Sequence, residues 1–293
     1  MTGGEKMKMN RRFRLILIIF SVMFITISLE FAWDLRQVQR VTAPYEEIEN
    51  KTQYTMTLEF VEETMTLQVR EKIVYMNQQE KALSNIYFHL YPNAFRTKSE
   101  VPFEKKEMTK AYPNGFNSGY IEILDIKQGK KPVDYKLMGD SSTVLRITPS
   151  KPVEVGSRIE FFIDFFVKLP NTYGRMGYGD NTVNIANWFP IVAVYDERGW
   201  NLDPYYAIGD PFYSEVASYK VTAILPKEYK MATTGNVIKT NNKKQNNIYE
   251  IEAKQVRNFV MILSKKFDVK ETMLDDIKVL SYSIGGLKGK ETL

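Results

Sequence analysis

The stretch RIEFFIDFFVKL, residues 158–169, has the strongest β-strand pattern in the sequence. Its apolar side chains recur at every second position, which is the period of a β-strand with one buried face. These positions are Ile159, Phe161, Ile163, Phe165 and Val167. Phe162 and Phe166 make the opposite face partly apolar, so we expect this strand to lie between two layers.

A similar alternation marks the start of the body of the chain. Residues 54–61 place apolar side chains at Tyr54, Met56, Leu58 and Phe60, and residues 65–69 repeat the pattern. The polar pair Glu62 and Glu63 separates the two runs, so the stretch predicts a β-hairpin.

Further strands are predicted at short spacing along the chain. They span residues 86–91, 120–126, 144–148, 219–225, 248–252, 259–264 and 277–283. Turn residues lie between them, and no segment after residue 50 has the period of an amphipathic helix. The sequence therefore predicts an all-β fold, a two-sheet sandwich or saddle.

The N-terminal residues differ from this body. Five basic residues precede an uncharged run at residues 15–29, and no small-residue cleavage site follows the run. Basic residues before an apolar segment favour a cytoplasmic N-terminus, so we expect a single transmembrane helix and signal anchor through residues 13–33. The localisation predicted is the cell membrane, single-pass with the body extracellular; a cleaved signal peptide is the alternative.

The charge of the chain gives no support for nucleic acid as a partner. The net charge is +5, but the N-terminal tail carries +4 of it, which leaves the body almost neutral. A nucleic-acid-binding domain normally carries a concentrated basic patch. With no cysteine in the chain, an exported body would be held by packing alone.

Histidine and cysteine counts exclude several kinds of catalytic site. His89 is the only histidine, and a catalytic zinc site usually needs at least two histidine or cysteine ligands. We therefore expect no zinc site within this chain. A Ser-His-Asp triad would need His89 as its base, yet His89 lies in the apolar run IYFHLYP, where a packed or surface-satisfied histidine is the favoured interpretation.

The loop-rich region 170–215 is the remaining place for chemistry or binding. Asp180, Asp196, Asp203 and Asp210 could supply a carboxylate pair for a hydrolase, although acidic loop residues are usually only solvated. The region also holds ten aromatic residues among glycine, proline and asparagine. Tyrosine and tryptophan are enriched where surfaces meet, so a docking surface or the wall of a ligand cleft is predicted here.

Three segments carry a resemblance to a known family. They are NIYFHLYPNAF at residues 85–95, NWFPIVAVYDERGW at 187–200 and GDPFYSEVASYKVTAILPKEYKMATTGN at 209–236. In order and spacing they resemble the N-terminal domain of the aminopeptidase N family of zinc metallopeptidases, and most closely its membrane-anchored bacterial members. The resemblance covers about residues 50–285.

The resemblance implies a domain organisation. Residues 1–34 would be a cytoplasmic basic tail and signal anchor, 35–50 a stalk, 51–275 the β-saddle N-terminal domain and 276–293 the truncated start of the catalytic domain. The HExxH motif and the zinc ligands of the family would lie beyond residue 293. Zinc is thus expected in the full-length enzyme and not in this chain.

The same resemblance implies a non-catalytic role. The chain would supply a wall of the peptide-binding cleft, with peptide substrate and the missing catalytic domain as partners. Many relatives carry an arginine where this chain has Asn187, and the segment between Pro190 and Asp210 is longer here. The candidate cleft or interface residues are Asn187, Trp188, Asp196, Trp200 and Asp210. A free-standing cell-surface β-sandwich module that binds glycan or peptide is the alternative function.

Overall fold

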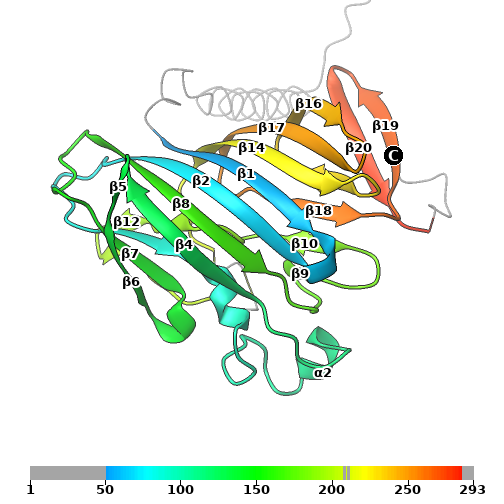
Figure 1. The fold of residues 1–293 in the computed structure, drawn as a ribbon, viewed down its shortest axis with the longest axis horizontal. Helices are drawn as coiled ribbons and strands as arrows, with labels where there is room; N and C mark the ends of the chain where they lie inside the picture. The colour runs from blue at the N-terminus through cyan, green and yellow to red at the C-terminus, as the bar shows by residue number, and fades with distance from the viewer. Residues whose placement is uncertain (1–50, 207–208, 210–211, 286–293) are drawn as a thin grey trace, which may run out of the picture. The chain divides into compact units, whose positions relative to one another are not determined.

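The computed structural model describes residues 51–206, 209 and 212–285. The expected tail, anchor and stalk (1–34, 13–33 and 35–50) and Asp210 lie outside the described residues. Among the residues that are described, none belongs to a helix of the length and apolar character that a membrane span requires. The regular secondary structure of the described residues is almost entirely β-strand, as the sequence predicts (Figure 1).

One eight-stranded sheet forms the main layer. Its spatial order is β16 (Asn236–Asn242), β17 (Asn246–Val256), β14 (Ala217–Pro226), β1 (Thr52–Val61), β2 (Thr66–Met76), β8 (Arg158–Lys168), β4 (Tyr120–Gln128) and β5 (Lys131–Pro132). The predicted hairpin is confirmed, because β1 and β2 pair antiparallel through a short 3-10 turn, η2 (Glu62–Thr64). β1 also pairs in parallel with β14, which starts more than 150 residues later in the chain.

Period-two alternation explains which face of this sheet is buried. Tyr54, Met56, Leu58 and Phe60 are buried, whereas the threonines between them are exposed. β8 follows the same rule on its inner face. Its outer face is open, since Phe162 is 36% exposed, so the expectation that β8 lies between two layers is wrong.

The reason is local packing on the outer face. The ammonium group of Lys72 lies 5.6 Å from the centre of the Phe162 ring, and Phe166 packs edge-to-face on Tyr120 at 5.8 Å. Neighbouring side chains of the same sheet therefore cover these two rings in part, and a second layer is not needed.

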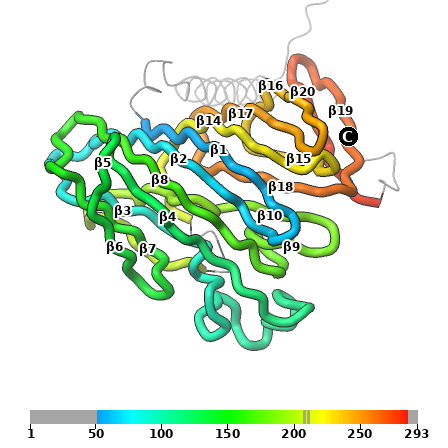
Figure 2. Tube along the Cα trace, in the orientation of Figure 1, coloured from blue at the N-terminus to red at the C-terminus, as the bar shows by residue number. Residues whose placement is uncertain are grey.

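Two four-stranded sheets form the second layer, where we expected a single sheet. One has the order β15 (Lys230–Thr233), β18 (Met261–Ser264), β10 (Val183–Ile185) and β9 (Met176–Tyr178). The other has the order β11 (Ile191–Val192), β3 (Ile86–His89), β7 (Val144–Thr148) and β6 (Asp134–Met138). Figures 1 and 2 show both sheets behind the eight-stranded sheet.

Aromatic contacts join the layers into one core. Phe88 of β3 packs edge-to-face on Phe161 of β8, with ring centres 6.1 Å apart. Tyr54 of β1 stacks on Tyr219 of β14 at 4.9 Å, and Phe259, just before β18, lies 5.8 Å from Tyr219. Buried aromatic pairs of this kind add to the burial of apolar area, so the core is continuous across both small sheets.

The remaining elements are short. They are η3 (Tyr91–Phe95), α2 (Met108–Ala111), η4 (Asp140–Ser142), the hairpin β12 (Tyr195–Asp196) and β13 (Gly199–Trp200), and the hairpin β19 (Asp268–Leu274) and β20 (Ile277–Ser283). The boundary expected after residue 275 lies in the turn of this last hairpin.

Candidate functional site

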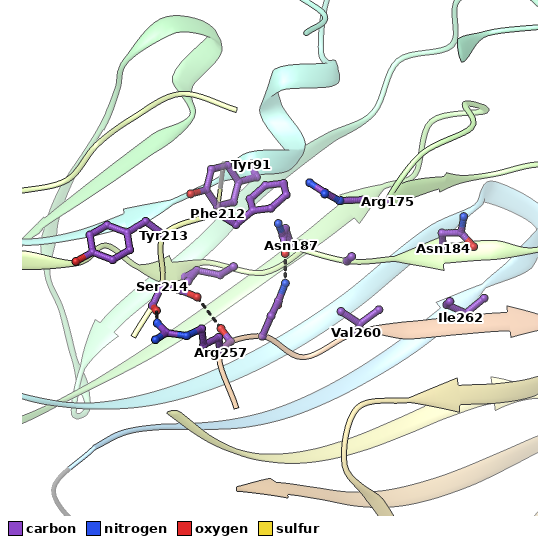
Figure 3. Close-up of a pocket in the computed structure, with 13 residues that line it drawn as sticks. Tyr91, Arg175, Asn184, Asn187, Phe212, Tyr213, Ser214, Arg257, Val260 and Ile262 are labelled. Atoms are coloured by element: carbon purple, nitrogen blue, oxygen red, sulfur yellow. Dashed lines mark hydrogen bonds between the residues drawn. The ribbon is translucent and has the colours of Figure 1, made fainter. Parts of the chain in front are cut away.

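A cavity of about 550 Å³ opens beside the sheet that contains β10 and β18 (Figure 3). Asn184 and Ile262 are register partners on these two strands, and both line it. The other lining residues come from η3, from β11 and from the loops around them: Tyr91, Arg175, Ala186, Asn187, Ile191, Phe212, Tyr213, Ser214, Arg257, Asn258 and Val260. Loops placed around a rigid sheet are a common setting for a binding site.

Asn187 is the sequence-predicted residue that lines this cavity. It follows β10 and has φ of +54°, a left-handed conformation that asparagine tolerates better than most residues. Its side chain is 3% exposed and accepts a hydrogen bond through Oδ1 from Nδ2 of Asn258. Asn258 Oδ1 in turn accepts from the backbone N–H of Phe259 at 2.8 Å, which fixes the orientation of both amides.

The fixed amides leave one donor of Asn187 without a partner. Its Nδ2 is buried and makes no hydrogen bond to any described residue. In Figure 3 the Asn187 amide nitrogen lies on the Phe212 side of the cavity. A buried N–H group without an acceptor costs about 1–3 kcal/mol, so this donor favours a ligand that brings an acceptor.

Trp188 differs from the expected surface residue. Its indole is fully buried and its Nε1 donates to the carbonyl of Phe259 at 3.2 Å. The ring also packs on Phe189 at 5.3 Å. Trp188 therefore anchors the Asn187 segment to the start of β18 from behind and offers no surface to a ligand.

Asp196 and Trp200 lie together in the β12–β13 hairpin and do not line the cavity. Asp196 accepts a hydrogen bond from the backbone N–H of Arg198 at 2.9 Å, which is the main cause of a lowered pKa of its carboxyl. Trp200 packs on Tyr195 at 5.2 Å and on Tyr87 at 5.4 Å. The polar and aromatic groups of Asp196 and Trp200 thus already have partners, within the hairpin and on β3.

His89 is a packed residue, as the sequence indicates. Its ring is 2% exposed and stacks on Tyr91 with ring centres 4.6 Å apart. Burial lowers the pKa of His89 to about 4. A hydrogen bond with the Asn201 backbone and the charge of Asp203 both raise this pKa, but their effect is smaller than that of burial. His89 is neutral near pH 7 and holds Tyr91 at the cavity.

The described residues do not fit a zinc site. No group of three or more histidine, cysteine, aspartate or glutamate side chains lies close enough among them to hold a metal ion. Asp203 lies near His89 and Tyr91, while Asp180 accepts a hydrogen bond from Lys266 through its backbone oxygen. We derive no metal chemistry from this chain.

Sequence reasoning missed most of the lining. Arg175, Phe212, Tyr213, Ser214 and Arg257 come from separate segments that only the folded chain brings together. The aromatic density of residues 170–215 indicated Phe212 and Tyr213 in general terms. No pattern in the sequence marked the two arginines.

Comparisons with known proteins give a structural likeness only. No protein-family model matches the chain, and no curated protein matches it significantly. A solved two-domain M1 zinc metallopeptidase bound to L-arginine is similar with a TM-score of 0.48 and 11% identity, over 83% of this chain and 49% of that one. An M1 zinc metallopeptidase from Deinococcus radiodurans gives a TM-score of 0.46 and 11% identity over the same shares.

A variant of the Deinococcus radiodurans enzyme bound to the substrate Tyr-Ser-Ala gives a TM-score of 0.48 and 11% identity, over 82% of this chain and 49% of that one. The chain thus spans about half the length of these structures. With TM-scores below 0.5, we draw no functional conclusion from them.

Proposed function

We propose that this chain is the non-catalytic N-terminal portion of a membrane-anchored zinc metallopeptidase of the aminopeptidase class, and that it supplies a wall of the peptide-binding cleft. The observation that carries the proposal is the unpartnered amide nitrogen of Asn187 in the wall of the cavity. Asn187 is also the position at which the family resemblance expects a residue near the cleft.

The cavity has the chemistry that a peptide needs. Peptide backbone carbonyls are acceptors, and the Asn187 amide offers a donor from a dry position. Phe212 is half-buried and Tyr213 is 46% exposed, so both rings offer apolar surface to a side chain. Burial and the charge of Asp203 raise the pKa of the Tyr91 hydroxyl, which therefore keeps its proton.

The role needs no metal in this chain. A wall that fixes a peptide and excludes water accelerates a reaction whose catalytic groups another domain provides. Zinc belongs to that catalytic domain in this proposal. The coding sequence that follows residue 293 tests this partner, because the proposal expects an HExxH motif and a distal glutamate there.

The proposal also includes the membrane. The basic residues before the uncharged run support an anchor through residues 13–33 with the body outside the cell. An extracellular body would meet peptides rather than cytoplasmic proteins.

Peptide binding by the purified chain is the direct test. The full chain in a non-ionic detergent is titrated into a fluorescent tripeptide, and anisotropy reports binding. We expect Phe212→Ala to weaken binding about tenfold, the effect of losing about 1.4 kcal/mol of apolar contact. Phe166→Ala is the matched control, since Phe166 is a half-buried phenylalanine on the outer face of the eight-stranded sheet.

Two results would contradict the proposal. One is the absence of peptide binding by a chain that melts cooperatively. The other is equal binding by the Phe212→Ala chain and the parent. Binding of oligosaccharides in place of peptides would support the free-standing glycan-binding module.

A further inference from the structure

The charged side chains that line the cavity, within the part of the chain that the structure describes, are all positive. Arg175 and Arg257 are the only charged side chains among the described residues that line it, and neither aspartate nor glutamate is among them. The rest of the lining consists of amides, one serine, aromatic rings and aliphatic side chains. A cavity with two guanidinium groups and apolar walls attracts an anion more strongly than exposed arginines do, because part of the surrounding water is excluded.

Both arginines are held in place by the chain. The guanidinium of Arg175 lies 5.1 Å from the centre of the Phe212 ring, and its Nη2 donates to the carbonyl of Gly209 at 2.9 Å. Arg257 Nη1 donates to the carbonyl of Ser214 at 2.7 Å, while the Ser214 hydroxyl donates to the carbonyl of Arg257 at 2.8 Å. A guanidinium has five N–H donors, so each arginine retains donors for a ligand.

Asn187 adds a buried donor to the lining. Its Nδ2 is without a partner among the described residues, and its Oδ1 is already occupied by Asn258. Two arginines and one amide nitrogen therefore offer donors only. The ligand group that such a set matches is an acceptor without protons of its own, and a carboxylate has two oxygens of this kind.

We propose that the cavity binds a carboxylate group of a peptide, with Arg175 and Arg257 as charged donors and Asn187 as the buried donor. This inference rests on the proposed function, since it names the part of the peptide that the wall recognises. The carboxylate is either the C-terminal one or that of a glutamate or aspartate side chain. An aromatic or aliphatic neighbour of that group would contact Phe212 and Ile262.

Three labelled tripeptides distinguish the two sources of carboxylate. One is neutral in its side chains with a free C-terminus, the second is its C-terminal amide, and the third is that amide with one glutamate. The full chain in non-ionic detergent is titrated with each at low and at moderate salt. We expect at least one carboxylate peptide to bind ten times more tightly than the neutral amide, with the difference shrinking as salt rises.

Substitutions of the lining residues test which side chains cause the preference for a carboxylate peptide. Asn187→Asp keeps the shape of the side chain, removes the donor and adds a negative charge, so we expect it to abolish the preference for carboxylate. Arg175→Gln and Arg257→Gln should each reduce the preference severalfold. Arg198→Gln is the matched control, because Arg198 is an exposed arginine of the β12–β13 turn that does not line the cavity.

The outcomes separate this inference from the proposed function. Equal binding of all three peptides by the parent chain overturns the carboxylate site and leaves the peptide wall intact. Failure of every peptide to bind overturns both. A carboxylate preference that survives Asn187→Asp and both glutamine variants places the recognition elsewhere and also overturns the inference. The comparison of peptides on the parent chain remains decisive even if a variant fails to fold.

Discussion

Glu71 projects from β2 into the core, where its register neighbours are Met56 on β1 and Ile163 on β8. The side chain is 2% exposed, and neither carboxylate oxygen has a hydrogen-bond partner among the described residues. Burial raises the pKa of this carboxyl well above its usual range. A neutral carboxylic acid is therefore the form that the core accepts most readily.

Replacing Glu71 by an apolar residue should stabilise the protein. The pKa of the Glu71 carboxyl is higher in the folded chain than in the unfolded chain. The contribution of this carboxyl to stability is therefore fully present below the unfolded pKa and is lost as the pH rises through the folded pKa. We expect Glu71→Met to raise the free energy of unfolding by about 1–3 kcal/mol at pH 8 and by less at pH 4.5. Chemical unfolding at both pH values measures it, and a destabilised variant at pH 8 would contradict the assignment.

His89 should have the opposite pH dependence. Its folded pKa of about 4 lies below the ordinary histidine value of 6.5. Between these two pH values the His89 side chain is protonated in the unfolded chain and neutral in the folded chain. The free energy of unfolding therefore falls by about 3 kcal/mol because of His89 as the pH drops from about 6.5 to 4.

The non-titrating variant His89→Phe isolates this effect. It keeps a ring that can stack on Tyr91, so its free energy of unfolding should fall less than that of the parent between pH 7 and pH 4. Urea titrations of both chains provide the comparison. Parallel losses in the two chains would show that His89 is not responsible.

For single residues, the sequence indicated the environment of some side chains correctly and that of others wrongly. The single histidine was correctly interpreted as packed, because its flanking residues are apolar. Trp188 was expected at a surface and lies in the core, since tryptophan serves both environments and sequence cannot separate them. The Asn187 donor depends on an amide pair with Asn258, 71 residues away, which no local pattern encodes.

Gly235 shows how a single backbone position shapes an element. It connects β15 to β16 with φ of +81°, and a Cβ atom there would lie 2.3 Å from the backbone oxygen of Glu252 and 2.6 Å from the Cβ of Ala253. Both partners belong to β17, the strand on which β16 pairs. Only glycine allows β16 to approach β17 at this point.

Substitution of Gly235 should therefore weaken the edge of the large sheet. We expect Gly156→Ala to cost about 1–2 kcal/mol, because φ there is +70° but no atom lies within 4 Å of the added Cβ. Gly235→Ala should cost a further 1–3 kcal/mol from the steric clash. Thermal unfolding of the two variants gives the difference, and equal melting temperatures would refute the steric account.

Elements with strong alternation were predicted and weak ones were missed. β7 and β20 have the predicted bounds, and β1, β8 and β14 lie within two residues of them, whereas β2 extends seven residues beyond the predicted run. The strands β9 to β13 have only two or three residues each, too few for a period to show. β16 is exposed along its whole length and carries no apolar face, so its pairing with β17 defines it.

For the whole molecule, the sequence does not show which strands that are far apart in the chain pair with each other. The all-β class follows from local alternation, whereas the parallel pairing of β1 with β14 joins segments far apart in the chain. The division of the second layer into two sheets likewise depends on which short strands find partners. The cavity lies among these non-local pairings, and its lining was therefore only partly predicted.

The proposed orientation in the membrane can be tested cleanly because the chain contains no cysteine. Ser150→Cys places one thiol on an exposed position of the body, and Gly3→Cys places one before the proposed anchor. We expect a membrane-impermeant maleimide to label Ser150→Cys on intact cells and Gly3→Cys only after lysis. The reverse pattern, or labelling of neither on intact cells, would contradict an extracellular body.

Photo-cross-linking tests whether the cavity at Asn187 forms the wall of a peptide-binding cleft, as we propose. A tripeptide with a benzophenone group is irradiated with the full chain, and mass spectrometry locates the adducts. We predict adducts on residues that line the cavity, namely Phe212, Tyr213, Ser214, Arg257, Asn258, Val260 and Ile262, and their loss on competition with unlabelled peptide. Adducts confined to the outer face of the eight-stranded sheet, or none above a non-peptide probe, would contradict the claim.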